Sequence, residues 1–125
     1  LCTAADAALD THADAFEQLR DLEANAQAML ADLTGMQLYC MQSARLAEVG
    51  KLSPTVAGLA KMHNTRTARK ILSEARDLLG GNGILLEHHV VRHWADIEAI
   101  HTFEGTETIQ TLIVGRDVTG ISAFT

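Results

Sequence analysis

Apolar residues recur three and four positions apart along most of the chain, which is the period of α-helices that bury one face. Strand-like alternation is almost absent. A long stripe predicts a helix that ends near Gly50; its members are Leu22, Ala26, Met29, Leu33, Met36, Cys40 and Ala47. A weaker stripe precedes it, with a joint or a simple continuation near Arg20; its members are Ala5, Leu9, His12, Phe16 and Leu19. The chain is therefore predicted to be all-α.

The second predicted helix has a start and an end that the sequence marks. Ser53 can cap a helix N-terminus, and Pro54, the single proline, is favourable at the first helical position. The run Gly80-Gly81-Asn82-Gly83 predicts the end, because glycine adopts the left-handed conformation that closes helices. The residues expected to be buried in between are Val56, Leu59, Ala60, Ala68, Ile71, Leu72, Ala75, Leu78 and Leu79.

Two shorter helices complete the expected fold. One is predicted over about residues 87–96 from its apolar spacing. The last opens near Thr106 and ends by Gly120; its predicted buried residues are Ile109, Leu112, Ile113 and Val118. Antiparallel helices with short connections favour a four-helix-bundle-like architecture. With 125 residues, 47% of them hydrophobic, residues 1–125 are expected to form one domain with its own core.

Composition narrows the function classes. The formal net charge of −6 argues against binding to nucleic acid or to an anionic membrane, because both require a cationic surface. No apolar run approaches the roughly 20 residues that span a bilayer. Cys2 and Cys40 form neither a disulfide framework nor a thiolate zinc site, so a reducing compartment is expected. The sequence starts at Leu1 rather than at Met, which is typical of a processed chain or of a fragment.

Two segments have spacings that suggest ligand binding, and each has a simpler explanation. The glycine run at 80–83 would let backbone N–H groups approach a phosphate, although a helix cap explains most of it. His89 and His93, with His88 nearby, have the spacing of metal ligands on one helical face. No third ligand accompanies them, so solvated or hydrogen-bonded histidines are the favoured interpretation, and no metal is predicted.

A third segment, His101 to Thr106, places the carboxylate of Glu104 just before a predicted helix start. Its spacing alone favours a capping role near the positive end of the helix dipole, with Thr106 as the cap. The alternative is a general base, because an apolar setting beside Phe103 and Ile100 would make a carboxylate more basic. The residues leave both interpretations open.

Three segments in one order resemble the C-terminal signature of the acyl-CoA dehydrogenases. They read ARDLLGGNGI at 75–84, HVVRH at 89–93 and IEAIHTFEGT at 97–106, and the continuation IQTLIVGR at 109–116 agrees as well. The resemblance covers roughly residues 30–124. The first segment and the ending GRDVTGI at 115–121 are more similar to glutaryl-CoA dehydrogenases than to the straight-chain enzymes.

The resemblance implies a flavin-dependent enzyme that oxidises an acyl-CoA thioester between its α and β carbons; in the glutaryl branch, the enoyl product of this oxidation then loses CO₂ to give crotonyl-CoA. It implies that Glu104 is the catalytic base and that Phe103, Glu104 and Gly105 contact the substrate. The residues it assigns to the FAD cofactor are Gly80, Gly81, Gly83, Thr106 and Thr108. It further implies a homotetramer, an electron-transfer flavoprotein or similar acceptor, and a bacterial cytoplasmic or mitochondrial matrix location.

Some features depart from the family pattern. Asp77 stands where many members have Gln, and Phe103 stands where many have Tyr. The Arg-x-x-Phe-Gly element that reaches FAD from the first long helix has no counterpart at residues 10–20. The family's N-terminal helical and middle β-domains are expected to lie outside this chain, which alone should be inactive. The alternative function is a helical oligomerisation or interaction module without catalysis.

Overall fold

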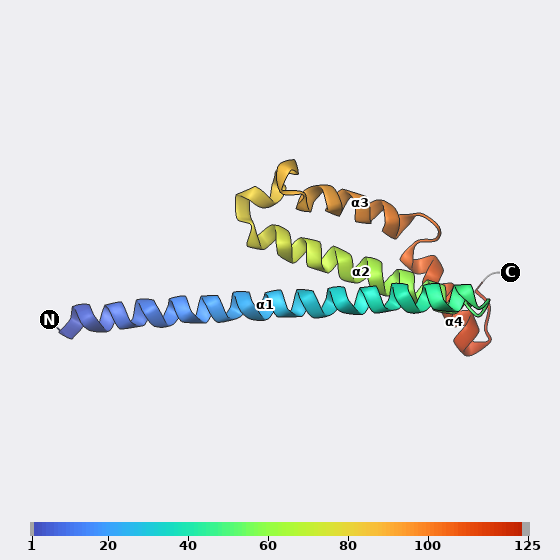
Figure 1. Ribbon diagram of the computed structural model, residues 1–125, viewed down its shortest axis with the longest axis horizontal. Helices are drawn as coiled ribbons and strands as arrows, with labels where there is room; N and C mark the ends of the chain where they lie inside the picture. Colours follow the sequence, from blue (N-terminus) through green and yellow to red (C-terminus); the bar gives the residue numbers. More distant parts are fainter. Residues whose placement is uncertain (1, 124–125) are drawn as a thin grey trace. The chain divides into compact units, whose positions relative to one another are not determined.

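Four α-helices, two short 3₁₀ turns and no strand make up residues 2–123, the part of the chain that this computed structural model describes. Side chains are described over residues 13–123. The elements in chain order are α1 (Cys2–Glu48), α2 (Pro54–Leu78), η1 (Gly80–Ile84), η2 (Leu86–His88), α3 (Val90–Thr102) and α4 (Glu107–Thr119) (Figure 1). The all-α prediction is confirmed.

The chain forms two units, Leu1–Ala31 and Asp32–Thr125. α1 is uninterrupted and continues through Arg20 without a joint, and it ends at Glu48, close to the predicted limit. In the first unit the side chains of Phe16 and Leu19 are exposed. The predictions for Cys2, Ala5, Leu9 and His12 lie outside the described side chains.

Within the second unit α2 is the central element, since it packs against α3, α4 and η1. Its start follows the predicted chemistry: the Ser53 hydroxyl accepts a hydrogen bond from the N–H of Val56 over 3.2 Å, and Pro54 is the first helical residue. Its end does too, because Gly80 adopts a left-handed φ of 54° directly after the last turn.

The third helix differs from its prediction at both ends. It begins at Val90 rather than near residue 87, because His89 has a left-handed φ of 68° and closes η2 as a separate turn. It runs on to Thr102, past the expected end near residue 96, because no glycine or proline lies in that stretch. The last helix matches its prediction, with the Thr106 hydroxyl accepting from the N–H of Ile109 at 3.5 Å and Gly120 left-handed at its end.

The expected hydrophobic core is not closed. Over residues 13–123 only Gly58, Thr65, Thr67 and Gly83 are buried, and no hydrophobic side chain is. The residues that were predicted to be buried but are exposed are Leu59, Leu78, Leu79, Ile109 and Val118. The physical reason is that α3 and α4 each cover only part of α2, so apolar faces stay open to solvent. Among the described residues, no helix has both the length and the apolar character that crossing a bilayer requires.

Candidate active site

The segment that joins α3 to α4 contains two consecutive left-handed residues, Glu104 with φ 56° and Gly105 with φ 92°. Glycine adopts such angles freely. For a residue with a side chain they cost about 1–2 kcal/mol, so the surrounding structure has to hold Glu104 in place. The Glu104 side chain is exposed.

The backbone of this segment is held by side chains from both neighbouring helices. The ammonium group of Lys61 on α2 donates to the carbonyl oxygens of Phe103 and Gly105. The amide nitrogen of Gln110 on α4 donates to the carbonyl oxygen between them, that of Glu104, over 2.8 Å. Three successive carbonyl oxygens therefore accept hydrogen bonds from side chains of the two flanking helices, α2 and α4. These bonds supply the restraint that the unusual conformation of Glu104 needs.

Two glycines make room for the Gln110 amide. A Cβ atom at Gly58, which is buried on α2, would lie 2.8 Å from Oε1 of Gln110. A Cβ atom at Gly105 would lie 2.7 Å from Nε2 of the same side chain. The amide is thus confined between two positions where only glycine fits without displacing it.

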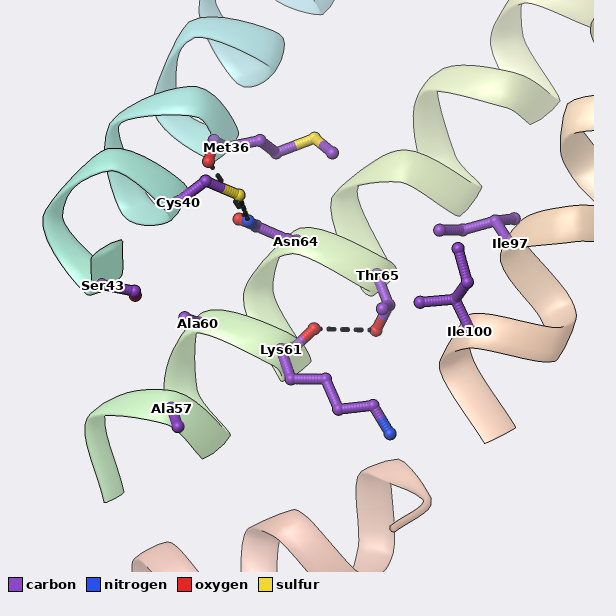
Figure 2. Close-up of a pocket in the computed structure, with 10 residues that line it drawn as sticks. All are labelled: Met36, Cys40, Ser43, Ala57, Ala60, Lys61, Asn64, Thr65, Ile97 and Ile100. Carbon is purple, nitrogen blue, oxygen red and sulfur yellow. Dashed lines mark hydrogen bonds between the residues drawn. The ribbon is translucent and has the colours of Figure 1, made fainter. Parts of the chain in front are cut away.

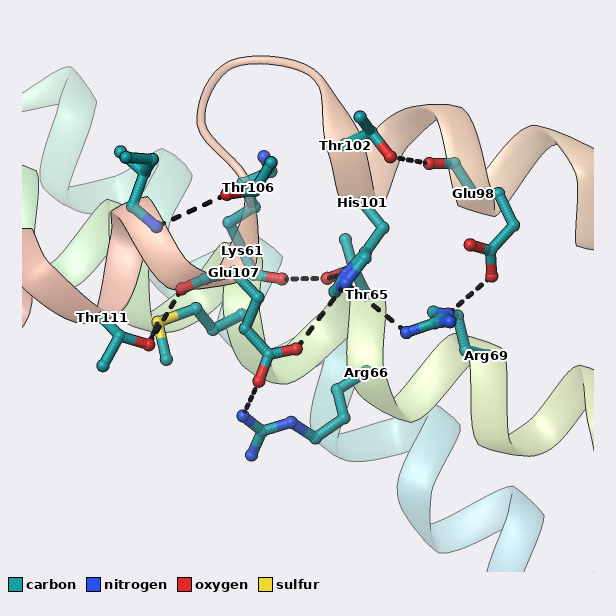
Figure 3. Close-up of polar contacts among 12 residues, drawn as sticks. Lys61, Thr65, Arg66, Arg69, Glu98, His101, Thr102, Thr106, Glu107 and Thr111 are labelled. Atoms are coloured by element: carbon teal, nitrogen blue, oxygen red, sulfur yellow. Dashed lines mark hydrogen bonds and ion pairs between the residues drawn. The ribbon is translucent and has the colours of Figure 1, made fainter.

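A polar cluster adjoins this segment and engages the second acid of the region, Glu107 (Figure 3). The Thr65 hydroxyl, only 5% exposed, donates to the carbonyl oxygen of Lys61 and lies 2.9 Å from Nδ1 of His101. A hydroxyl has one proton, so Nδ1 of His101 is the donor in the second contact. Nε2 of His101 lies 3.6 Å from the Glu107 carboxylate, which also forms an ion pair with Arg66.

The two acids at this helix start therefore differ in their partners. The hydrogen bond from Arg66 lowers the pKa of Glu107 below its ordinary value, although partial burial acts in the opposite direction. Glu107 is a charged structural partner. The Glu104 carboxylate forms no ion pair within residues 13–123.

The glycine run at 80–83 combines structural glycines with one that the chain's own packing does not explain. A Cβ atom at Gly83 would lie 2.3 Å from the carbonyl oxygen of Arg76, and Gly80 needs its left-handed backbone. Gly81 has no positive φ, and nothing lies within 4 Å of where its Cβ would be. Its exposed backbone can be approached closely from outside.

The structure brings some of the predicted residues together and separates others. Phe103, Glu104, Gly105 and Thr106 are adjacent, and Thr108 is exposed in the first turn of α4. The glycine run lies at the opposite end of α2, about 26 Å from Lys61 by helical rise. Within one chain, the glycines of η1 therefore do not join the Glu104 site, since η1 follows the C-terminal end of α2 and Lys61, nearer the other end, contacts the carbonyls beside Glu104 (Figure 1).

An apolar cleft of about 420 Å³ lies on the other side of Lys61, between the second half of α1, α2 and α3 (Figure 2). Its walls include Met36, Cys40, Ile97 and Ile100. Figure 2 shows the Lys61 side chain extending away from α1. The cleft has no acid or histidine in its lining, so it offers space for an apolar group rather than acid–base chemistry.

The histidines of the second predicted segment do not form a shared site. His89 precedes α3 and has a left-handed backbone, so it is not on one helical face with His93. His88, His89 and His93 are all exposed. Among the residues that the structure describes, no three His, Cys, Asp or Glu side chains gather as metal ligands would.

Lys61, Gln110 and Gly58 are the site residues that sequence reasoning missed. A signal for Lys61 was present: it shares a helical face with Gly58 and Thr65, both buried. A lysine on the buried face of a helix needs partners for its charge. Gln110 carried no such signal.

Comparison with known proteins identifies the family of the chain. The family model described as "Acyl-CoA dehydrogenase, C-terminal domain" matches residues 5–119. The chain belongs to the acyl-CoA dehydrogenase family. The predicted family and the predicted fold class are both confirmed.

Relatives of this acyl-CoA dehydrogenase domain include the probable acyl-CoA dehydrogenase YdiO of Escherichia coli, 29% identical over 90 residues that cover 72% of this chain and 24% of that protein. The crystal structure of glutaryl-CoA dehydrogenase from Mycobacterium smegmatis is similar with a TM-score of 0.71 and 38% identity, over 79% of this chain and 27% of that one. A second crystal structure, of a glutaryl-CoA dehydrogenase from the same organism in complex with FADH2, is similar with a TM-score of 0.77 and 33% identity. The match covers 82% of this chain and 27% of that one. The chain thus spans about a quarter of the length of these relatives.

Proposed function

We propose that this chain is the C-terminal domain of a flavin-dependent acyl-CoA dehydrogenase of the glutaryl-CoA type, in which Glu104 is the catalytic base. One observation carries the assignment of the base. Glu104 has an unpaired, exposed carboxylate on a left-handed backbone whose carbonyl oxygen, and those of both neighbours, are held from outside. Backbone strain that the surroundings maintain is concentrated at functional sites.

In this proposal Glu104 acts through its side chain and its backbone. The carboxylate takes the proton from the α carbon of the acyl-CoA thioester. The negative charge that this leaves on the α carbon is delocalised onto the thioester oxygen. The backbone N–H of Glu104 donates to that oxygen and stabilises it. This N–H is available, because it donates to no group among the described residues. Phe103 and Gly105, on either side, line the same position.

FAD supplies the oxidant when it is bound, by accepting a hydride from the β carbon of the substrate. The residues present fit such a group. The bare backbone at Gly80 and Gly81 would receive the diphosphate, with Gly83 holding the turn closed against Arg76. At the other end of α2, Thr106 and Thr108 would contact the adenine nucleotide portion.

The separation of these two groups supports assembly of several copies. Because the glycine run and Glu104 lie at opposite ends of α2, they would serve different flavin sites, so the glycine run of one copy would complete the site of another. Open apolar faces on the helices support association, and a homotetramer is the proposed state.

The remaining parts of the proposal rest on the family and on the glutaryl-CoA dehydrogenase neighbours. They are glutaryl-CoA as substrate, decarboxylation of its enoyl oxidation product to crotonyl-CoA, an electron-transfer flavoprotein or similar acceptor, and a bacterial cytoplasmic or mitochondrial matrix location. Activity is proposed for a longer protein, since this chain spans about a quarter of its relatives.

The test compares Glu104→Gln with Glu107→Gln in the full-length, flavin-loaded protein. Glu104→Gln keeps the shape and the N–H but removes the proton acceptor, so glutaryl-CoA should still bind while anaerobic flavin bleaching slows by about 10²- to 10⁴-fold. Glu107→Gln should reduce its flavin at close to the wild-type rate. If Glu104→Gln is as fast as wild type, or if Glu107→Gln is the variant that fails, the assigned base is wrong.

A second candidate function is a helical oligomerisation module without catalysis. The exposed apolar side chains of α1 and α2 favour it. It would replace the enzyme proposal if the full-length protein bound no flavin and reduced none with any acyl-CoA, yet still assembled.

A further inference from the structure

We propose that Lys61 is a positioning residue, whose ammonium group holds the carbonyl oxygens on both sides of Glu104 and so fixes the direction of the base and of its backbone N–H. This inference rests on the proposed role of Glu104. It gives a charged side chain from α2 a role at a site whose base lies in the segment between α3 and α4.

The ammonium group of Lys61 binds the backbone on both sides of Glu104. An ammonium group has three donors, and two of them are used on the carbonyl oxygens of Phe103 and Gly105. The nitrogen also lies 5.9 Å from the centre of the Phe103 ring, within the range of a cation–π contact. Hydrogen bonds from a charged donor are stronger than neutral ones, the more so at this half-buried position.

Because a peptide group is planar, holding its carbonyl oxygen also fixes the direction of the N–H that follows. In a trans peptide the C=O and the following N–H point in opposite directions, and the peptides here are trans. Because Lys61 holds the Phe103 carbonyl toward α2, the N–H of Glu104 points away from α2. Gln110 orients the next peptide through the Glu104 carbonyl. With both flanking peptides fixed, the Cα–Cβ bond of Glu104 has one direction.

The partners of Lys61 distinguish it from an ordinary structural lysine. Lys70, nine residues further along α2, pairs with the carboxylate of Asp32 at 3.0 Å. Lys61 forms no ion pair within residues 13–123, although it is half-buried. Placing an ammonium group there without a counter-charge is unfavourable for folding. We infer that this unfavourable placement of the ammonium group is retained because it orients Glu104.

The test measures anaerobic flavin reduction by saturating glutaryl-CoA in the full-length, flavin-loaded protein. Lys61→Met keeps the stem but has no donors, and it should slow the reduction rate constant by about 10- to 10²-fold, since small misplacements of reacting groups cost this much. The apparent affinity for glutaryl-CoA should stay the same. Lys61→Arg, which keeps two or more donors, should recover most of the rate, and Lys70→Met should match wild type. A wild-type rate in Lys61→Met would overturn the proposal.

A double-mutant cycle tests whether Lys61 acts through Glu104. In a Glu104→Gln background no base remains to be positioned and only the backbone N–H is left to orient, so adding Lys61→Met should slow the residual rate by a smaller factor than it slows the wild-type rate. An equal loss in both backgrounds would mean that Lys61 acts in another way and would overturn the proposal. If Lys61→Met does not fold, Lys61→Gln, with a shorter stem and a neutral donor, replaces it, and a wild-type rate there has the same consequence.

A crystal structure of the Lys61→Met protein separates this proposal from the proposed function. The expected result is that Glu104 leaves the left-handed region and its N–H changes direction. If the backbone at Glu104 is unchanged, Lys61 is not what holds it, whether or not the enzyme is active. If the wild-type protein fails to reduce its flavin with any acyl-CoA, the proposed function fails, and the crystal structure still decides whether Lys61 sets this backbone.

Discussion

The carboxylate of Glu107 on α4 forms an ion pair with the guanidinium group of Arg66 on α2. The hydrogen bond from Arg66 lowers the pKa of Glu107 below its ordinary value of 4.5 in the folded chain. A carboxyl group whose pKa is lowered by folding adds stability that is present above 4.5 and is lost as the pH falls through the folded value. Acid should therefore weaken the contact between α2 and α4.

The measurement for this prediction is the free energy of unfolding in urea at neutral pH and at several values below 4.5. Wild type should lose stability more steeply than Glu107→Gln over the acidic range. The Glu107 side chain is 32% exposed, so the difference between the two should be below about 1 kcal/mol. Parallel curves for the two proteins would show that the ion pair contributes nothing to folding.

The left-handed backbone of Glu104 predicts that a variant can gain stability while losing function. Glu104→Gly removes the steric cost of this conformation and should raise the free energy of unfolding by up to about 1 kcal/mol, allowing for the greater flexibility of unfolded glycine. Ala99 lies inside the last turn of α3, four residues before the C-cap residue Phe103. Ala99→Gly should instead lower the free energy of unfolding by about 0.5–1 kcal/mol. A destabilised Glu104→Gly would mean that the conformation is not strained.

The glycine run predicts a separation between stability and cofactor retention. Gly83→Ala places a Cβ against the carbonyl oxygen of Arg76 and should cost about 1–3 kcal/mol. Gly81→Ala meets nothing within the chain and should change stability by less than about 0.5 kcal/mol. In the full-length protein, however, Gly81→Ala should weaken FAD retention, because its methyl group occupies the surface proposed to face the diphosphate. Equal FAD content in Gly81→Ala and wild type would exclude that role.

The open apolar surface predicts self-association of the chain. Leu38 and Met41 are three residues apart on α1, and their side chains are 60% and 52% exposed. Sedimentation should show oligomers for wild type, and Leu38→Glu combined with Met41→Glu should shift the distribution toward monomer. Gln37→Glu combined with Gln42→Glu, which adds the same two charges at exposed polar neighbours, is the control and should change little. A wild-type monomer at high concentration would contradict the prediction.

Local chemistry made some elements predictable from the sequence. Ser53 with Pro54 gave the start of α2, Gly80 its end and Thr106 the start of α4, because caps and glycine angles depend only on neighbouring residues. The start of α3 was missed since nothing in the sequence around His89 indicates a left-handed backbone. That conformation depends on how the surrounding turns pack.

The residues that hold the base were not predictable in the same way. Glu104 itself was identified through a family resemblance, while its spacing alone favoured a capping role. Lys61 reaches Phe103 across 42 residues, and no periodic pattern links two such positions. The predicted burial failed at Leu59 and Leu79 for a related reason, since an apolar stripe indicates which face will be covered and not whether this chain supplies the cover.

The location of Lys61 near one end of α2 and of the glycine run just beyond the other makes this helix a spacer of fixed length and phase. One inserted residue between them would lengthen it by about 1.5 Å and turn its far end by about 100°. Insertions should be tolerated at the turn of Gly50 and Lys51 before α2, where they would leave the spacing between the two sites unchanged.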